Sequence, residues 1–335
     1  MTSPVPSPET RASERSKRFQ KAAIRLIGPL ILVLLVLRIG DTRKILATLA
    51  GADFGPLGLA LLLNLACNHL KVLRWTSLLR RRGVEYPVKR AWTSFLSSVY
   101  VGMLTPGRVG DVLRVQYLRH DAGLPYAEGL AIVVMDRICD LYVLVGFVAL
   151  GVVRFSSVVV GKLAIVMWAG VALTILGPLV LLIPGLAERL MERVYQKVAR
   201  ERSATGLSRF LAALRAQVSP QLVGALLLTL GAFLVNYAQG FLIARALHLH
   251  IAFYDVVCLL AIASLLGLLP ISVSGVGVRE LFFALVFPVL GYSAETGVGF
   301  GLLVFVTIYL AVMVLGFISW QIAPPPVETE TSNSP

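Results

Sequence analysis

Apolar residues in this chain gather into long runs that are separated by short polar and basic segments. An α-helix needs about twenty consecutive apolar residues to cross the roughly 30 Å of hydrocarbon in a bilayer. We therefore predict about six full membrane spans, at residues 22–39, 56–79, 129–152, 162–184, 220–243 and 296–319. Charged residues separate the first run from any small-residue cleavage site, so we interpret it as an uncleaved helix rather than a signal peptide.

Two further apolar stretches are too short to cross comfortably, and each leads into a cluster of Gly and Pro. The first cluster lies in FLSSVYVGMLTPGRVGDVLR at 95–114, and the second in LLGLLPISVSGVGVREL at 265–281. Such breaks expose backbone groups that lipid cannot satisfy, so they occur only where they are buried in protein or line a wet cavity. We predict two re-entrant hairpins, at 91–114 and 254–288. Their helix-breaking residues are Pro106, Gly107, Gly110 and Pro270.

Basic residues concentrate in alternate loops. Residues 1–25, 74–90 and 185–219 hold six, six and seven Lys or Arg, and the loops between them hold few. The positive-inside rule places the basic loops in the cytoplasm. That assignment alternates correctly if both short stretches are re-entrant. We therefore expect a multi-pass plasma-membrane protein with its N-terminus and C-terminus in the cytoplasm.

The two halves of the chain, 56–152 and 220–319, then follow opposite paths through the membrane. Each half has a span, a hairpin and a second span, which is the order of an inverted repeat; the alternative is eight ordinary helices, some of them short. Inverted repeats occur in transporters, whose sites lie at the repeat interface near broken helices. We expect one transmembrane domain at 21–322, flanked by polar, disordered tails at 1–20 and 323–335.

Composition supports lipid as the main solvent of this chain. Of its 335 residues, 57% are hydrophobic and 15% are charged, whereas a soluble domain carries about 25% charged residues. The net charge of +13 comes largely from loops beside apolar runs, which favours contact with anionic lipid and not with nucleic acid. The three cysteines lie far apart in apolar runs and fit neither a disulfide framework nor a zinc site. We expect no metal and no cofactor.

The first Gly/Pro cluster carries charges that could bind an anion. The segment after Pro106-Gly107 should open a new helix, and the free N–H groups of a helix N-terminus attract phosphate. Arg108 and Arg114 can each hold two oxygens, and Asp111 can orient an arginine or take up a proton. The alternative is a surface loop whose charges are solvated.

The second cluster repeats these devices. Its glycines allow close backbone approach and positive φ, and its serines can donate to an anion. The candidate residues are Ser272, Ser274, Gly275, Gly277, Arg279 and Glu280. Arg279 and Glu280 are adjacent, so on a helix they point about 100° apart and need not pair. No Gly-Lys-Ser/Thr follows, so the segment is not a nucleotide-binding P-loop.

Two apolar spans also contain polar residues. Asp136 and Asp140 share a helix face with Arg137 close by, and such charges usually pair inside the bundle. They could be counter-ions for the hairpin arginines, a structural salt bridge, or, on weaker grounds, a metal site. In span 56–79, Arg74 and Trp75 are typical of interface anchors. The polar stripe on that span predicts hydrogen bonds between helices in preference to substrate contact. Its members are Asn64, Asn68 and Lys71.

The order of these motifs resembles the lysylphosphatidylglycerol synthase transmembrane-region family, also called flippase-like, over about residues 20–320. The motifs are Arg-Trp at 74–75, Pro-Gly-Arg-x-Gly-Asp at 106–111, Asp-Arg-x-x-Asp at 136–140 and Pro-x-Ser-x-Ser-Gly-x-Gly-x-Arg-Glu at 270–280. The last motif is the most specific. The family typically has Glu where this chain has Asp111 and Asp136, which keep the charge on a shorter side chain.

The resemblance implies a membrane module that moves lipid. In the two-domain synthases a separate soluble domain transfers the aminoacyl group, and we find no counterpart in this sequence, so we expect a transporter rather than an enzyme. The expected partner is an anionic or modified phospholipid or a polyprenyl-phosphate-type lipid. The alternatives are a membrane-embedded transferase acting on lipid phosphates and a non-catalytic subunit that recruits a lipid-modifying enzyme.

Overall fold

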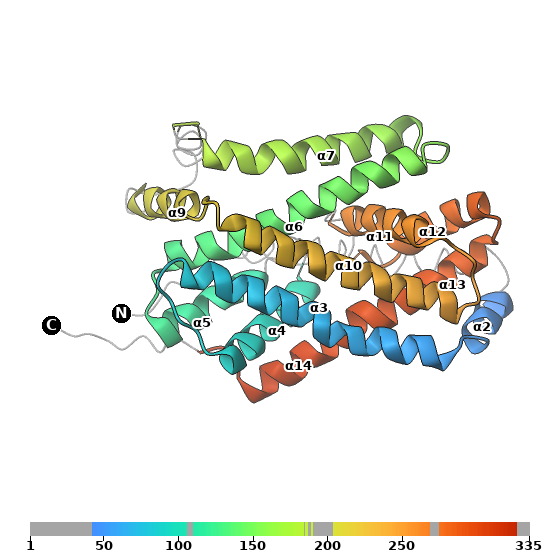
Figure 1. The fold of residues 1–335 in the computed structure, drawn as a ribbon, viewed down its shortest axis with the longest axis horizontal. Coiled ribbons are helices and arrows are strands. Elements are labelled where there is room, and N and C mark those ends of the chain that lie inside the picture. The colour runs from blue at the N-terminus through green and yellow to red at the C-terminus, as the bar shows by residue number, and fades with distance from the viewer. Residues whose placement is uncertain are drawn as a thin grey trace, which may run out of the picture.

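The computed structural model of the protein describes residues 42–105, 110–183, 185–186, 189, 204–268 and 275–326 (Figure 1). All regular secondary structure within these residues is helical. Three of the helices are long and apolar enough to span a membrane, namely Phe54–Arg80, Leu222–Ala246 and the continuous Ala294–Ile322. The protein is therefore an all-α polytopic membrane protein, as predicted. Several predictions lie outside the described residues: the span at 22–39, the tail at 1–20, and Pro106, Gly107 and Pro270.

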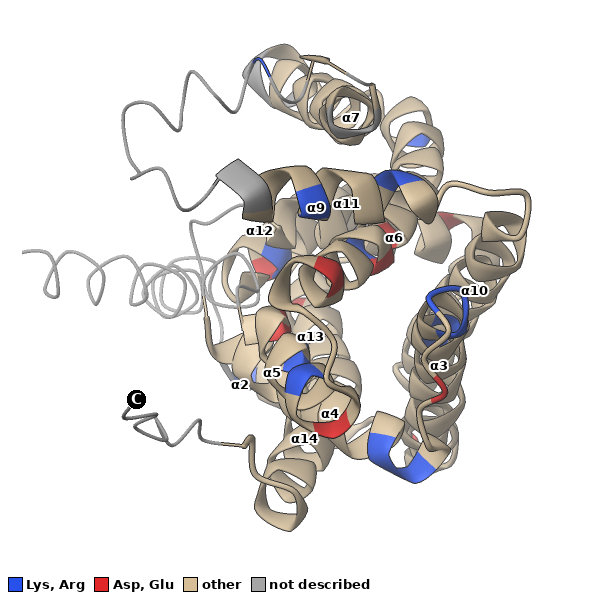
Figure 2. Ribbon diagram, turned by 90° about the vertical axis from the view of Figure 1, so that its left-hand side faces the viewer, with Lys and Arg blue, Asp and Glu red and all other residues tan. Residues whose placement is uncertain are grey.

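The helices follow one another with short connections. Their bounds are α2 Thr42–Ala50, α3 Phe54–Arg80, α4 Val88–Leu104, α5 Leu113–Ala122, α6 Tyr126–Arg154, α7 Gly161–Leu182, α9 Ala204–Ala216, α10 Leu222–Ala246, α11 Phe253–Gly267, α12 Val278–Val286, α13 Ala294–Val304 and α14 Ala311–Ile322. A 3-10 turn, η4, covers Phe287–Leu290, and a π-helical turn, η5, covers Phe305–Leu310 between α13 and α14. Helix α7 packs against α6 on the outside of the bundle (Figures 1 and 2).

Ion pairs fix which helix ends lie together at one end of the bundle. Arg90 at the start of α4 pairs with Asp121 at the end of α5, with 2.6 Å between Nε and Oδ2. Arg82, just after α3, pairs with Glu128 near the start of α6 at 2.6 Å. Helices α4 and α5 therefore form a hairpin whose two outer ends meet where α3 ends and α6 begins. Figure 2 looks onto this end, where charged segments gather.

The second half of the chain runs the other way. At the opposite end of the bundle, the backbone N–H of Asp53 before α3 donates to the carbonyl of Ala246 in α10 at 2.8 Å. Arg154 at the end of α6 pairs there with Asp255 at the start of α11 at 2.6 Å. The α11–α12 hairpin therefore enters from this end, and α3 and α10 lie antiparallel along each other (Figure 1). This path is that of the predicted inverted repeat.

Packing between the halves follows the same symmetry. Helix α4 of the first hairpin packs against α14, and α11 of the second hairpin packs against α6. A glycine allows the close approach in each pair. A Cβ at Gly316 in α14 would lie 2.6 Å from the carbonyl oxygen of Leu96, and a Cβ at Gly151 in α6 would lie 2.9 Å from that of Cys258. Helix α14 of the second half thus packs closely against the first hairpin, and α6 of the first half packs closely against the second hairpin.

The hairpin arms also close on pairs of glycines. A Cβ at Gly110 would lie 2.5 Å from the backbone nitrogen of Gly102, and a Cβ at Gly275, whose φ is +75°, would lie 2.8 Å from the Cα of Gly267. Only glycine allows backbones to approach this closely. The three glycine pairs 102 and 267, 110 and 275, and 151 and 316 are each offset by 165 residues. One uniform offset therefore relates the two halves.

Two elements differ from the sequence prediction. The first hairpin does not end at residue 114, because α5 continues to Ala122 and ends at Gly123, which has a left-handed φ of 63°. In the basic segment 185–219 we expected a helix lying in the membrane interface over about 186–200, most of which lies outside the described residues. The structure shows a later helix there, α9, whose Leu211 and Leu214 are fully buried where α9 packs against α6. Its apolar run is too short to span a membrane, but Leu207, Phe210, Leu211 and Leu214 stand at the i, i+3, i+4, i+7 spacing that indicates an amphipathic helix.

Candidate functional site

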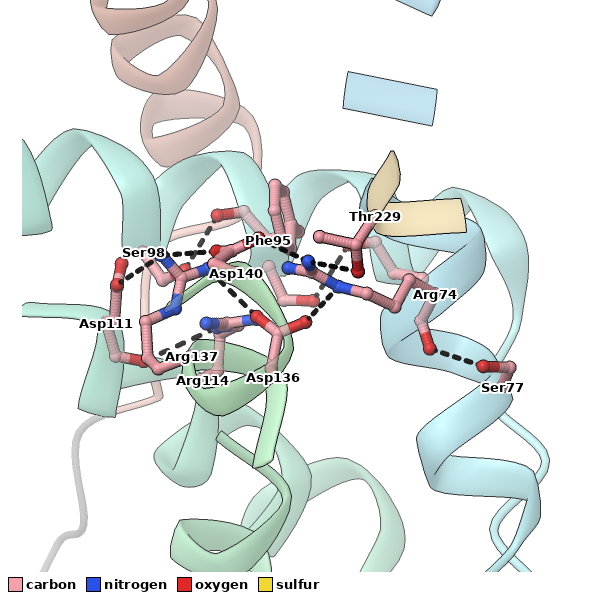
Figure 3. Close-up of polar contacts among 12 residues, drawn as sticks. Arg74, Ser77, Phe95, Ser98, Asp111, Arg114, Asp136, Arg137, Asp140 and Thr229 are labelled. Atoms are coloured by element: carbon pink, nitrogen blue, oxygen red, sulfur yellow. Dashed lines mark hydrogen bonds and ion pairs between the residues drawn. The ribbon is translucent and has the colours of Figure 1, made fainter. Parts of the chain in front are cut away.

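A cluster of three arginines and three aspartates lies where α3, α5 and α6 meet (Figure 3). Its members are Arg74, Asp111, Arg114, Asp136, Arg137 and Asp140. Three of them were predicted as supporting charges on α6 and two as residues of the first hairpin. The charges cancel within the cluster. Buried charges are stable only when they are paired and hydrogen-bonded.

Asp136 is the centre of the cluster. Its Oδ1 accepts a hydrogen bond from Nε of Arg74 at 2.7 Å, and its Oδ2 accepts from Nη1 of Arg114 at 3.0 Å and from Nη2 of Arg137 at 2.9 Å. The side chains of Asp136, Arg74 and Arg114 are completely buried. Three different segments are therefore held together by one carboxylate.

The rest of the cluster connects this centre to the second half of the chain. Asp140 accepts from Nη1 of Arg74 and pairs with Nη1 of Arg137 at 3.1 Å. Arg137 also lies 3.5 Å from the carboxylate of Asp111, in the turn before α5. On the other side, Nη1 of Arg74 donates to the hydroxyl of Thr229 in α10 at 3.0 Å. The cluster thus bridges α3 and α6 of the first half to α10 of the second.

Arg74 and Trp75 are not interface anchors, so that prediction was wrong. Both side chains are completely buried, and the indole ring of Trp75 lies beside the guanidinium of Arg114 at 5.6 Å. Phe95 flanks the same guanidinium at 5.0 Å. A signal for this role exists in the sequence, since two carboxylates on one face of a membrane helix need cations from a neighbouring helix.

A second buried pair lies in the other hairpin. Arg279 donates to Oε1 of Glu280 from Nη2 at 2.7 Å and from Nε at 3.1 Å. The two were expected to point apart. They pair because they lie in the first turn of α12, where Oε2 of Glu280 folds back to accept from the N–H of Gly277 at 2.6 Å. The guanidinium of Arg279 lies over the ring of Tyr309 at 4.6 Å.

The 165-residue offset makes Arg114 and Arg279 equivalents, and each is the second residue of its hairpin's second arm. Each is held by one carboxylate and stacked on aromatic rings. The carboxylate itself differs, because the equivalent of Asp136 is Gly301. A Cβ at Gly301 would lie 3.0 Å from Cγ of Glu280, so the glycine leaves room for that side chain. The two halves therefore neutralise equivalent arginines with carboxylates that come from non-equivalent positions, Asp136 of α6 and Glu280 of α12.

One cavity of about 350 Å³ reaches both hairpins. Its charged lining among the described residues consists of Lys71, Arg137, Asp140 and Arg279. Most of the remaining wall is apolar and comes from α4, α6, α10 and η5. This combination of size, apolar wall and few polar groups is typical of a ligand site.

The predicted site residues fall into three groups. Arg137, Asp140, Gly275 and Arg279 line the cavity. A second group lies in the hairpins but is absent from the lining: Gly110, Asp111, Arg114, Gly277 and Glu280. Asp136 is also absent from the lining, and it forms an ion pair with the lining residue Arg137. Arg108, Ser272 and Ser274 lie outside the described residues.

The polar stripe on α3 divides between two environments. Asn64 donates to the carbonyl of Thr307 in η5 at 2.7 Å, which is the predicted bond between helices. Among the described residues, the side chain of Asn68 donates only to the carbonyl of Asn64 within its own helix, at 2.8 Å. Lys71 lines the cavity, and in the part of the chain that the structure describes its side chain forms neither a hydrogen bond nor an ion pair. Interpretation as a helix-packing stripe therefore missed Lys71.

The fold and the cavity together define a class: an all-α integral membrane protein in which two inverted halves enclose a mostly apolar cavity with a few charged residues in its wall. Residues 22–316 match the family described as the lysylphosphatidylglycerol synthase TM region, and the chain belongs to this family, as its motifs predicted. The chain is also similar to a UPF0104 membrane protein of Methanothermobacter thermautotrophicus. The two are 23% identical over 296 residues, which cover 82% of this chain and 84% of that protein. The family description indicates a membrane protein of lipid-related function.

Proposed function

We propose that the protein moves an anionic or modified phospholipid, or a polyprenyl-phosphate-type lipid, across the plasma membrane. One observation carries this proposal: a single cavity is lined by both hairpins and by the charges of α6. Thr105 at the end of α4 and Gly275 before α12 both border it. A head group inside the cavity would therefore touch both halves of the inverted repeat at once.

The inverted halves suggest how the lipid would cross. In this proposal the hairpins are re-entrant from opposite faces, and both termini lie in the cytoplasm. One half rocks against the other, so the cavity opens to each face in turn. The main contacts across the halves lie between α3 and α10 and between each hairpin and one helix of the other half, with smaller ones between α6 and α10 and between α3 and η5. Such surfaces can slide as rigid bodies while the buried ion pairs stay within each half.

The geometry favours transport over a metal-dependent transferase. Asp136 accepts hydrogen bonds on both oxygens from three arginines, and Asp140 pairs with two of the same three. A divalent ion between these carboxylates would have to displace Arg74 and Arg137 from the bundle interior. That exchange would leave buried guanidinium groups without partners, which is costly.

Reconstitution tests the proposal. Purified protein is placed in liposomes that carry fluorescent phosphatidylglycerol, and a membrane-impermeant quencher reports how fast the outer leaflet is replenished. We expect the wild-type protein to speed replenishment and Arg279→Met, which removes a charge from the cavity wall, to slow it. The matched control is Arg154→Met, which removes an arginine from an ion pair at the bundle end, with its side chain 40% exposed.

The same vesicles separate the alternatives. Metal-dependent conversion of the lipid without leaflet exchange would refute transport and support the transferase. If neither conversion nor exchange occurs, the result supports a non-catalytic subunit. Equal exchange rates in Arg279→Met and wild type would show that lipid does not pass through this cavity.

A further inference from the structure

Among the described cations of the cavity wall, Lys71 is the one without a counter-charge. Arg137 is held by three aspartates of the cluster, and Arg279 is held by Glu280. Lys71 lies one turn before Arg74 on α3 and lines the same cavity. No carboxylate of the described residues pairs with it.

The described charges of the wall, taken together with the charged residues that pair with them behind it, therefore do not sum to zero. The three arginines and three aspartates of the cluster cancel, and so do Arg279 and Glu280. Lys71 remains as one excess positive charge. A charge in a confined, mostly apolar cavity acts through a low effective dielectric, so it attracts an anion more strongly than a solvated lysine does.

The neutral polar groups near Lys71 complete a binding surface. Asn68 precedes it by three residues on the same face of α3, and both line the cavity. Asn236 of α10 also lines it and is the equivalent of Lys71 under the 165-residue offset. Because α3 and α10 pack antiparallel along each other, the two equivalent positions face a common space. Only the α3 position of this pair carries a charge.

We infer that Lys71 binds the phosphodiester of a head group with a single net negative charge, and that the arginines serve to hold the wall. This inference rests on the proposed function. A lysine ammonium is a compact point charge with three donors that adapts to one phosphate oxygen. The amides of Asn68 and Asn236 line the same cavity as neutral hydrogen-bonding groups. Lipids without net charge should bind more weakly because they bring no net negative charge to balance the positive charge of Lys71.

Binding in detergent tests Lys71 without requiring transport. Delipidated protein is titrated with short-chain phosphatidylglycerol, which carries one net negative charge, and with short-chain phosphatidylcholine, which carries none. We expect the wild-type protein to bind phosphatidylglycerol about tenfold more tightly, the effect of one charge-assisted hydrogen bond of about 1.5 kcal/mol. Lys71→Met should reduce that preference to about twofold or less, and Lys71→Arg should keep most of it.

Two further arms make the outcome decisive. Lys89→Met removes an exposed lysine of α4 that is not part of the cavity wall, and it should keep the wild-type preference. Inorganic phosphate should not compete with phosphatidylglycerol at the lipid's saturating concentration; full competition would show that the site takes a soluble anion and would overturn the lipid assignment. Retention of the full preference by folded Lys71→Met would also overturn the inference.

The binding result separates this inference from the transport proposal. If wild-type protein binds phosphatidylglycerol through Lys71 but exchanges no lipid between leaflets, the inference stands and transport fails. If lipid exchange occurs and is unchanged by Lys71→Met, transport stands and the inference fails. Thermal unfolding of each variant confirms that the cavity is folded, and we expect Lys71→Met to be at least as stable as wild type.

Discussion

Arg74→Met should destabilise the protein severely although Arg74 lies near the basic end of a membrane span. Its guanidinium donates to Asp136 at 2.7 Å and to Thr229 at 3.0 Å, and it also contacts Asp140. Removing it leaves the buried Asp136 and the partly buried Asp140 each short of a partner. Breaking a buried ion pair by deleting one member costs about 3–5 kcal/mol, so we expect a loss in that range. An interface anchor, by contrast, would cost about 0–1 kcal/mol.

The free energy of unfolding in mixed micelles provides the measurement. Purified protein in a mild detergent is titrated with sodium dodecyl sulfate, and tryptophan fluorescence follows unfolding, because Trp75 lies next to the cluster. The matched control is Arg154→Met. Arg154 also pairs with an aspartate, Asp255, but its side chain is 40% exposed, so its loss should cost about 0–1 kcal/mol.

A second variant tests whether charge balance is the reason. In Arg74→Met/Asp140→Asn the cluster again has equal numbers of arginines and aspartates. The double variant should therefore be more stable than Arg74→Met alone by more than about 1 kcal/mol, since the stranded carboxylate is gone. The reasoning is refuted if Arg74→Met costs no more than Arg154→Met, or if the two substitutions simply add.

Three further predictions follow from single contacts. Gly275→Ala forces a side chain onto a backbone with φ of +75°, 2.8 Å from Gly267, and should cost about 1–3 kcal/mol of unfolding free energy. Asn64→Leu removes the donor to the η5 carbonyl and should cost about 1–3 kcal/mol, with faster hydrogen exchange in η5. Burial acts to raise the pKa of Asp121, but hydrogen bonds led by that from Arg90 lower it to about 2. The ionised carboxylate of Asp121 therefore stabilises the fold fully above the unfolded pKa of about 3.9, and this stabilisation is lost as pH falls towards 2. In Asp121→Asn the melting temperature should accordingly change less with pH over that range.

Each of these predictions has a control and a contrary result. Gly224→Ala, where a Cβ would meet nothing within 4 Å, should be neutral or stabilising, and equal behaviour of the two alanine variants would contradict the strain argument. Asn68→Leu should leave η5 exchange unchanged because Asn68 bonds only within α3. Glu85 is exposed, so Glu85→Gln should leave the fall in melting temperature at acid pH unchanged. An unchanged fall in Asp121→Asn would show that another group causes it.

The long helices could be predicted because lipid imposes length and apolarity on the chain. Helix α3 extends the predicted span 56–79 by two residues at its start and one at its end, and α10 begins two residues after the start of the predicted span 220–243 and ends three residues beyond it. The interior of the repeat was harder to read. Its signal is not overall identity but a few positions at a constant offset, such as a glycine followed four residues later by an arginine at 110–114 and again at 275–279. Those positions persist because backbone approach and buried charge tolerate no substitute.

The site was only partly predictable, because a sequence does not state which spans are neighbours. Asp136 and Asp140 could be placed on one face of α6, but their partner Arg74 could be any cation that α6 meets. Arg74 and Lys71 are both polar residues near the basic end of one apolar helix, three positions apart. Only the position of the aspartates shows that one of these cations is bound to the wall and the other faces the cavity.

That difference gives the two cations opposite expected phenotypes. A cavity that opens to alternate faces must also exist without its lipid, and unpaired buried charges would destabilise that empty state. Among the described residues the arginines remain paired whether or not a head group is present, so Arg74→Met should reduce stability and affect binding only through the fold. Lys71 pays its desolvation cost in the empty cavity and recovers it when an anion arrives. Lys71→Met should therefore reduce binding while stability is kept or increased, and a variant that loses both together would show that Lys71 also belongs to the structural wall.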